Sequence, residues 1–263
     1  MEFALMHNCQ KKSEHCFISP PQLLAGLFVI MAVVLLRLAL LPNLPGTDEG
    51  FYGLHAMLAN KSLTSGEGLP PVGVLQLYPI ICSWVFSWDI NHILALRLCD
   101  MFVTSLLAWQ MFQLACRESK SVLAGCFVAL VFAVAINQPL FIQNGFKNAG
   151  FIAWLCFLPA LRIGLYANRQ RLAAFFLCGV LTCIGVFMRE SFGPLALISF
   201  FIVWPARGRA CAFSYAAGGI MAAIVILGLI GYARGGSSNL IEAYSMFALM
   251  ATEVGANTSD TFL

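Results

Sequence analysis

Seven long apolar stretches along the chain constrain its fold more than any other feature. A membrane helix needs about 20 mainly apolar residues, and most of these stretches approach or exceed that length. Only 10% of the 263 residues are charged, against roughly 25% in soluble domains. The candidate spans are 22–42, 92–116, 121–138, 149–166, 172–188, 191–205 and 211–232. We therefore predict an all-α integral membrane protein with about seven transmembrane helices, and we exclude a soluble globular domain.

Charge and cysteine content exclude two further classes of protein. The net charge of +3 is spread thinly, without a basic run that would neutralise a row of phosphates, so nucleic acid is not an expected partner. The ten cysteines form no C-x-x-C pair. We interpret them as small buried thiols rather than as a disulfide framework or a metal cluster.

The positive charges predict which side of the membrane each segment occupies. The stretch 72–88 is apolar but contains Gln76 and Pro79, and it is either an eighth span or an interfacial helix. The positive-inside rule decides for seven crossings, because four basic groups then share one side: Lys11/Lys12, Arg117/Lys120, Arg162/Arg169/Arg171 and Arg207/Arg209. The N-terminus is then cytoplasmic and the C-terminus outside.

This topology divides one transmembrane domain, residues 1–263, into simple parts. Residues 1–21 form a cytoplasmic tail, and span 22–42 is a retained anchor, since no signal-peptide cleavage site follows it. Residues 43–91 form an extracytoplasmic loop with interfacial helices, and 233–263 an extracytoplasmic C-terminal segment. The expected location is the bacterial inner (plasma) membrane.

Two adjacent acids, Asp48 and Glu49, open the outer loop one step beyond the first span. Phe51, Leu54 and Leu58 follow at the spacing of an amphipathic helix on the membrane surface. With Thr47 as N-cap, the acids would complement the helix dipole. The alternative is that they are functional groups on an otherwise acid-poor surface.

Two basic residues, Lys147 and Arg189, are expected on the outer side, against the positive-inside trend. They are either snorkelling anchors or ligands for an anion held at the membrane face. Inside span 92–116, Arg97 and Asp100 lie three residues apart on one helix face. A charge there costs at least about 2.5–3.5 kcal/mol, so we predict that these two form a structural pair. Arg37 is interpreted as a snorkelling side chain or phosphate contact.

Several motifs together resemble the C-type (GT-C) glycosyltransferases, in the branch of the protein O-mannosyltransferases and the lipid A aminoarabinose transferase. In that branch an Asp-Glu pair opens the first outer loop, a His-Pro-Pro-like element follows, the next span begins with an Ala-Arg-Leu-like element, and a Lys usually precedes the sixth span. The matching residues are Asp48-Glu49, Pro70-Pro71, Leu94-Ala95-Leu96-Arg97-Leu98 and Met188-Arg189-Glu190-Ser191. The resemblance covers about residues 22–232 and implies a GT-C-like membrane module. Most members are longer, so the chain is either a minimal module or a fragment.

The resemblance implies an enzyme that transfers a sugar from a polyprenyl-phosphate donor to a hydroxyl of a glycan, lipid or protein acceptor, outside the membrane and with inversion. Such a reaction needs a base for the hydroxyl and cations for the departing phosphate. The implied base is Asp48, with Glu49 at the acceptor or sugar. The remaining substrate-binding residues are Tyr52 and Trp84 stacking on a sugar, Lys147 and Arg189 at the phosphate, and the neighbouring Glu190.

No cofactor is required by this reading, although a divalent cation at Asp48 is a further option. Family members often carry an acid after the basic residue between spans three and four, where this chain has Asn148, so a bridging metal is not expected. Two other classes stay open. A transporter or flippase of a lipid-linked sugar would use Arg97, Asp100 and the Gly193-Pro194 break as parts of its pathway. A non-catalytic membrane subunit would need neither these residues nor the predicted catalytic and substrate-binding residues.

Overall fold

The computed structural model describes residues 19–39, 47–66, 77–87, 91–136, 149–168, 170–189 and 192–236, and the single positions 241 and 245. Regular structure in these residues is entirely helical, which confirms the all-α prediction. In chain order the elements are α2 (Pro20–Leu38), α3 (Thr47–Ser65), α4 (Leu77–Ser83), the 3-10 helix η1 (Trp84–Ser87), α5 (His92–Ser119), α6 (Val122–Ile136), α8 (Ala149–Tyr166), α9 (Leu172–Met188), α10 (Gly193–Arg207) and α11 (Arg209–Ala233).

Three of these helices, α2, α5 and α11, are long and apolar enough to cross a membrane. The apolar helices α6, α8 and α9 are shorter, so the seven crossings remain a prediction. Side chains that point away from the bundle are strongly apolar: Leu24, Phe28, Leu123, Phe127 and Ile224 are all more than 60% exposed. Apolar surface of this extent is typical of a membrane protein, whose outer face meets lipid rather than water.

The segment that was ambiguous in the sequence is short in the structure. The seven residues of α4 continue as the four residues of η1, a length of roughly 18 Å at 1.5–2.0 Å per residue. This is well below the hydrocarbon thickness of about 30 Å. The choice between an interfacial helix and an eighth span for the 72–88 stretch stays a prediction.

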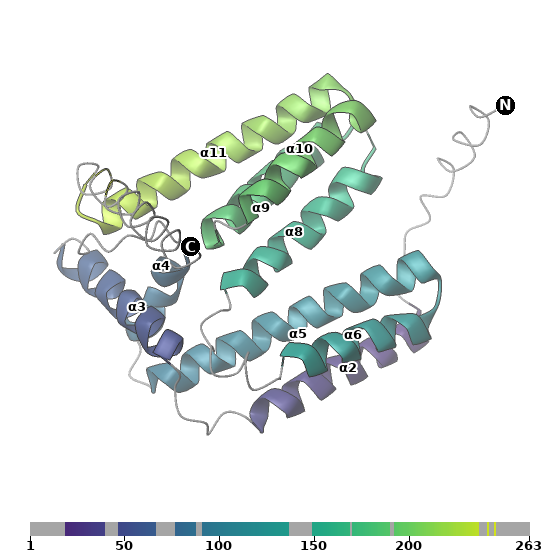
Figure 1. Cartoon of the computed structure of the whole chain (residues 1–263), viewed down its shortest axis with the longest axis horizontal. Helices are drawn as coiled ribbons and strands as arrows, with labels where there is room; N and C mark the ends of the chain where they lie inside the picture. The colour runs from purple at the N-terminus through teal and green to yellow at the C-terminus, as the bar shows by residue number, and fades with distance from the viewer. Residues whose placement is uncertain are drawn as a thin grey trace, which may run out of the picture.

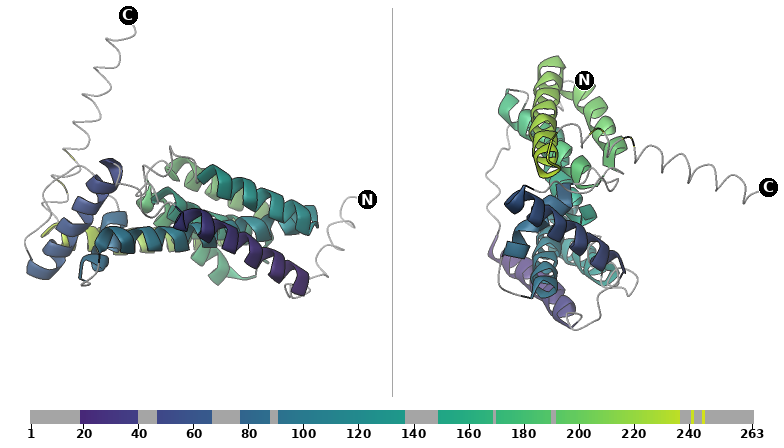
Figure 2. Two further views of the ribbon diagram at one scale, coloured as in Figure 1. Left: turned by 90° about the horizontal axis from the view of Figure 1, so that it is seen from below. Right: turned by 90° about the vertical axis from the view of Figure 1, so that its left-hand side faces the viewer.

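The longer helices lie side by side in two groups and alternate in direction along the chain (Figure 1). In the first group α5 packs against α2 and α6, and in the second α9 packs against α8 and α11, while α5 also contacts α8. Helices α3 and α4 lie across one end, which we call the α3 end (Figures 1 and 2). We call the opposite end, where α5 turns into α6, α8 into α9 and α10 into α11, the hairpin end.

Glycines permit a close helix contact between α9 and α11. A Cβ atom at Gly179 would overlap the backbone of Tyr215, and one at Gly218 would overlap the backbone of Phe176. Small residues of this kind let membrane helices approach until their backbones touch. The second group is therefore fixed by backbone contact as well as by side-chain packing.

One hydrophobic cluster joins sequence-remote segments at the α3 end. Its members include Ala56 on α3, Tyr78 on α4, Leu96 on α5, Met188 on α9 and Ile230 on α11, all less than 9% exposed. Because dispersion contacts add over many atoms, this shared core sets the positions of the helix ends that carry most of the candidate site residues.

Candidate functional site

Polar contacts fix α3 against the ends of α4, η1 and α11. The Asn60 amide donates to the Ser83 carbonyl oxygen at 2.9 Å and to the Ser87 hydroxyl at 2.8 Å. The hydroxyl of Ser62, a buried residue, donates to the carbonyl of Ala233, the last residue of α11. These bonds use side chains on the same face as the buried Ala59. The exposed side of the helix is mixed, with Leu54 and Met57 about half exposed and Lys61 exposed as well.

The predicted acids lie at the start of α3. The helix begins at Thr47, so Asp48 and Glu49 belong to its first turn and Tyr52 to its second. Thr47 is thus the first helical residue rather than the residue before the helix. The side chains of Asp48, Glu49 and Tyr52 are not among those that the structure describes. Two further predicted site residues, Lys147 and Glu190, lie wholly outside the described residues.

Arg189 ends α9 and reaches the first turn of α8. Its backbone N–H donates to the Gly185 carbonyl oxygen at 3.1 Å, and its own carbonyl oxygen accepts from Phe192 at 3.0 Å. The side chain lies over Gly150, the second residue of α8: a Cβ atom built there would be 3.3 Å from Arg189 Nη1 and 3.6 Å from Cδ. The absence of a side chain at Gly150 therefore makes room for the guanidinium.

This placement has electrostatic consequences. The amino end of a helix carries a partial positive charge and backbone N–H groups without intrahelical partners. A guanidinium beside it adds a second source of positive potential instead of cancelling the first. A helix amino end and an arginine together form a favourable site for an anion.

Trp84 borders an apolar cavity of about 530 Å³ between α4, η1 and α5, with Ile152 of α8 also in its wall. The other lining residues that matter here are Leu96, Phe102 and Asp100. Trp84 is 47% exposed, so its ring is accessible from outside the protein. A cavity of this size lies within the range of about 300–1,000 Å³ that small-molecule sites occupy.

Asp100 has an ion-pair partner that the sequence analysis did not assign to it. Arg37 Nη1 of α2 lies 3.2 Å from Asp100 Oδ2 of α5, with both side chains at most 8% exposed. The interpretation of Arg37 as a snorkelling side chain was therefore wrong, because its guanidinium is buried between two helices. The pairing of Arg97 with Asp100 stays a prediction, and Arg97 itself is half-buried.

A sequence signal for the Arg37 pair was present. Asp100 is the single acid within the seven predicted spans, whereas basic residues occur in more than one of them. An arginine in an apolar helix needs a counter-ion, so Arg37 and Arg97 were both candidates for the same carboxylate. Proximity along one helix favoured Arg97, and only the packing of α2 on α5 shows the second possibility.

Arg234, directly after α11, is a buried cation at the α3 end that sequence reasoning missed. It is 5% exposed, and burial lowers the pKa of its guanidinium from the ordinary value. Arginine nevertheless stays protonated in proteins, and the carboxyl end of α11 is a favourable place for a positive charge. The α3 end therefore holds at least two arginines, Arg189 and Arg234.

The metal and packing predictions can be compared with the described part of the chain. No group of three or more His, Cys, Asp or Glu side chains within it could hold a metal ion, but Asp48 is not among the side chains covered. The cysteines in the same residues are thiols and are not joined in disulfide bonds. His92 stacks on Phe86 at a centroid distance of 4.6 Å.

Comparison of the chain with protein-family models, with curated proteins and with solved structures gave no match.

Proposed function

We propose that the protein is a membrane glycosyltransferase that moves a sugar from a polyprenyl-phosphate donor to an acceptor hydroxyl at the α3 end of the bundle. The observation that carries this proposal is the position of Arg189, whose guanidinium lies over the first turn of α8. The expected reaction releases a lipid phosphate, and a phosphate is the anion that a guanidinium and a helix amino end together stabilise best.

The apolar cavity beside Trp84 supplies a suitable place for the lipid part of such a donor. Its walls are formed by α4, η1 and α5 and include Ile152, two residues after Gly150. The cavity and the Arg189 guanidinium thus both border the first turn of α8, at different positions of that turn. A donor with an anionic head and a prenyl tail has the matching distribution of charge and apolar surface.

The base is proposed to come from α3. Asp48 lies in the first turn of this helix, and the polar contacts of Asn60 and Ser62 hold the same helix against α4 and α11. Ala59 of α3 and Met188, which precedes Arg189, belong to one hydrophobic cluster. The shared cluster supports the proposal that an acidic group and a cationic group act on the same substrate.

In this mechanism the protein acts mainly by positioning. Asp48 accepts the proton of the acceptor hydroxyl while the hydroxyl oxygen attacks the anomeric carbon of the donor sugar. The bond between that carbon and the phosphate oxygen breaks, and its electron pair leaves with the phosphate. Arg189, with Lys147, stabilises the negative charge of the leaving group. Attack and departure occur on opposite faces of the sugar, so inversion is the expected stereochemical result.

The proposal is tested with purified protein in nanodiscs, a panel of undecaprenyl-phosphate sugars and a cell-envelope extract as acceptor. Asp48→Asn should lower the transfer rate by roughly 10²–10⁴-fold, the usual contribution of a general base, without changing the affinity for undecaprenyl phosphate. Arg189→Ala should weaken that affinity roughly 10- to 100-fold, because a hydrogen bond to a charged group contributes about 1.5–3 kcal/mol. Arg171→Ala, at an exposed arginine of the hairpin end, is the matched control.

Three results would contradict the proposal. The first is normal transfer by Asp48→Asn, and the second is unchanged undecaprenyl phosphate affinity in Arg189→Ala. The third is movement of a labelled lipid-linked sugar across the bilayer without any transfer, which would indicate the transporter alternative instead.

A further inference from the structure

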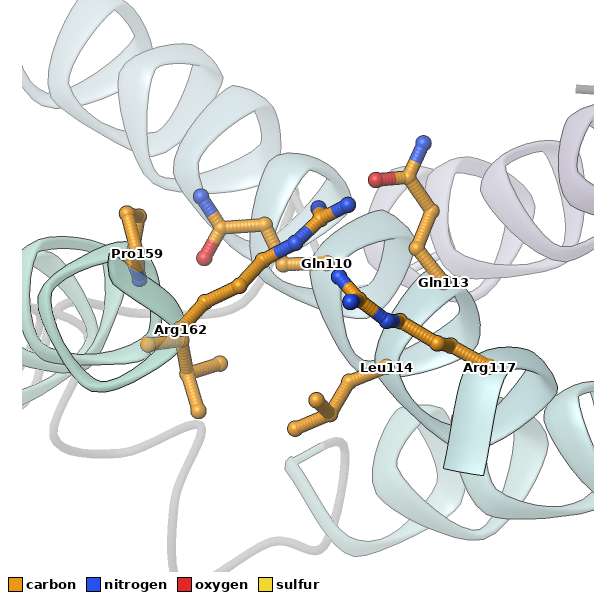
Figure 3. Close-up of a pocket in the computed structure, with 7 residues that line it drawn as sticks. Gln110, Gln113, Leu114, Arg117, Pro159 and Arg162 are labelled. Atoms are coloured by element: carbon orange, nitrogen blue, oxygen red, sulfur yellow. The ribbon is translucent and has the colours of Figure 1, made fainter. Parts of the chain in front are cut away.

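A second site with converging positive charge lies at the other end of the molecule. Arg117 of α5 and Arg162 of α8 border a cavity of about 140 Å³ between the two helices, together with Gln110 and Gln113. Their side chains leave different helices and extend toward one another across this cavity (Figure 3). The cavity is larger than the roughly 10–15 Å³ that a single water molecule needs.

Local helix electrostatics explain Arg117 but not its convergence with Arg162. Arg117 lies in the last turn of α5, where a cation is favourable, whereas Arg162 precedes the last turn of α8. Arg207 shows how a third arginine at this end is used, since its guanidinium donates to the carbonyl oxygens of Gly164 and Leu165 in the last turn of α8. Arg117 and Arg162 instead border one shared cavity, where two guanidinium groups from different helices can bind a single anion.

A residue that lines the cavity, Gln110, carries an unsatisfied buried oxygen, and the cavity has an apolar floor. The Oε1 atom of Gln110 is buried and has no hydrogen-bond partner among the described residues. This oxygen is an acceptor, so it requires a donor such as a hydroxyl group. Leu114 and Leu158 line the same cavity, which therefore offers two cations, an acceptor and aliphatic surface.

We propose that Arg117 and Arg162 bind the phosphate of an anionic phospholipid whose hydroxylated headgroup occupies this cavity at the hairpin end. Phosphatidylglycerol has the required chemistry: one negative phosphodiester for the two guanidinium groups, hydroxyls for the amide side chains of Gln110 and Gln113, and acyl chains that continue along Leu114 and Leu158. The site is separate from the proposed donor site, because Arg189 lies at the opposite end of α9 from the hairpin end. It does not depend on the proposed enzymatic activity.

The test is native mass spectrometry of the purified full chain, titrated with phosphatidylglycerol, phosphatidylcholine or inorganic phosphate. The wild type should bind phosphatidylglycerol more tightly than phosphatidylcholine, and inorganic phosphate at millimolar concentration should not displace it. Arg117→Gln and Arg162→Gln should each lower the phosphatidylglycerol affinity about fivefold, the equivalent of about 1 kcal/mol per basic residue near a lipid surface. Arg162→Lys, which keeps the charge, should lower it less.

Arg171→Gln is the control, because this exposed arginine lies at the hairpin end but does not border the cavity. It should leave the preference for phosphatidylglycerol unchanged. An equal loss in Arg171→Gln would overturn the site in favour of general surface charge, and equal affinities for the two lipids would overturn it as well. Displacement by inorganic phosphate would show a free-anion site and would contradict the assignment to a lipid.

Discussion

Replacing Asp100 by Asn should destabilise the contact between α2 and α5 more than any other single change of charge on α5. At 3.2 Å and an effective dielectric constant of about 20, the attraction between Arg37 and Asp100 amounts to about 5 kcal/mol. Removing one partner leaves a buried guanidinium without its counter-ion, which costs about 3–5 kcal/mol in measured cases. We therefore expect Asp100→Asn to lower the free energy of unfolding by about 3–5 kcal/mol.

The assay is reversible unfolding in mixed detergent micelles with increasing sodium dodecyl sulfate, followed by tryptophan fluorescence. The double variant Arg37→Met with Asp100→Leu should recover most of the lost stability, since apolar groups of similar volume replace buried ion pairs at little cost. Glu118→Gln is the matched control, as this acid is exposed on the same helix, and it should change the stability by less than about 0.5 kcal/mol. If Asp100→Asn is no more destabilising than Glu118→Gln, the reasoning about the buried pair is refuted.

Two further predictions concern the packing of α9 against α11 and of α3 against α4 and η1. Gly179→Ala should destabilise the protein by about 1–3 kcal/mol through overpacking, because its Cβ would overlap the backbone of Tyr215. Gly228→Ala is the control and should not destabilise the protein, because the space around Gly228 is open. Equal unfolding midpoints for the two variants would contradict the close α9–α11 contact. Asn60→Leu should remove the two hydrogen bonds that join α3 to α4 and η1, which should destabilise the docking of α3 by about 1–3 kcal/mol. The expected result is faster proteolysis within residues 43–91. An unchanged cleavage rate would show that these bonds do not hold α3.

Much of the helical architecture follows from the sequence because it depends on local composition. Each predicted span from 92–116 onward overlaps a helix, and α5 begins at His92 as expected, where Asn91 Oδ1 accepts a hydrogen bond from the Leu94 N–H. Apolar length and a cap are properties of neighbouring residues. The same holds for α3, which the acids and the apolar spacing of the first outer loop predicted.

Contacts between helices were not accessible to the same reasoning. The Arg37 partner depends on how α2 packs against α5, and the position of Arg189 depends on a glycine in the first turn of α8. The apolar cavity beside Trp84 is formed by three segments that are separate in sequence. Hydrophobic periodicity gives the buried face of a helix but not the residue opposite it, so these features needed the tertiary structure.

The most direct test of the account is a cryo-electron microscopy structure of the protein with undecaprenyl phosphate in nanodiscs. The account predicts density for the phosphate within hydrogen-bond distance of the Arg189 guanidinium and the first turn of α8, a prenyl chain in the cavity beside Trp84, and the Asp48 carboxylate facing the same space. A phosphate bound elsewhere, or an Asp48 side chain directed toward the acyl chains, would contradict it.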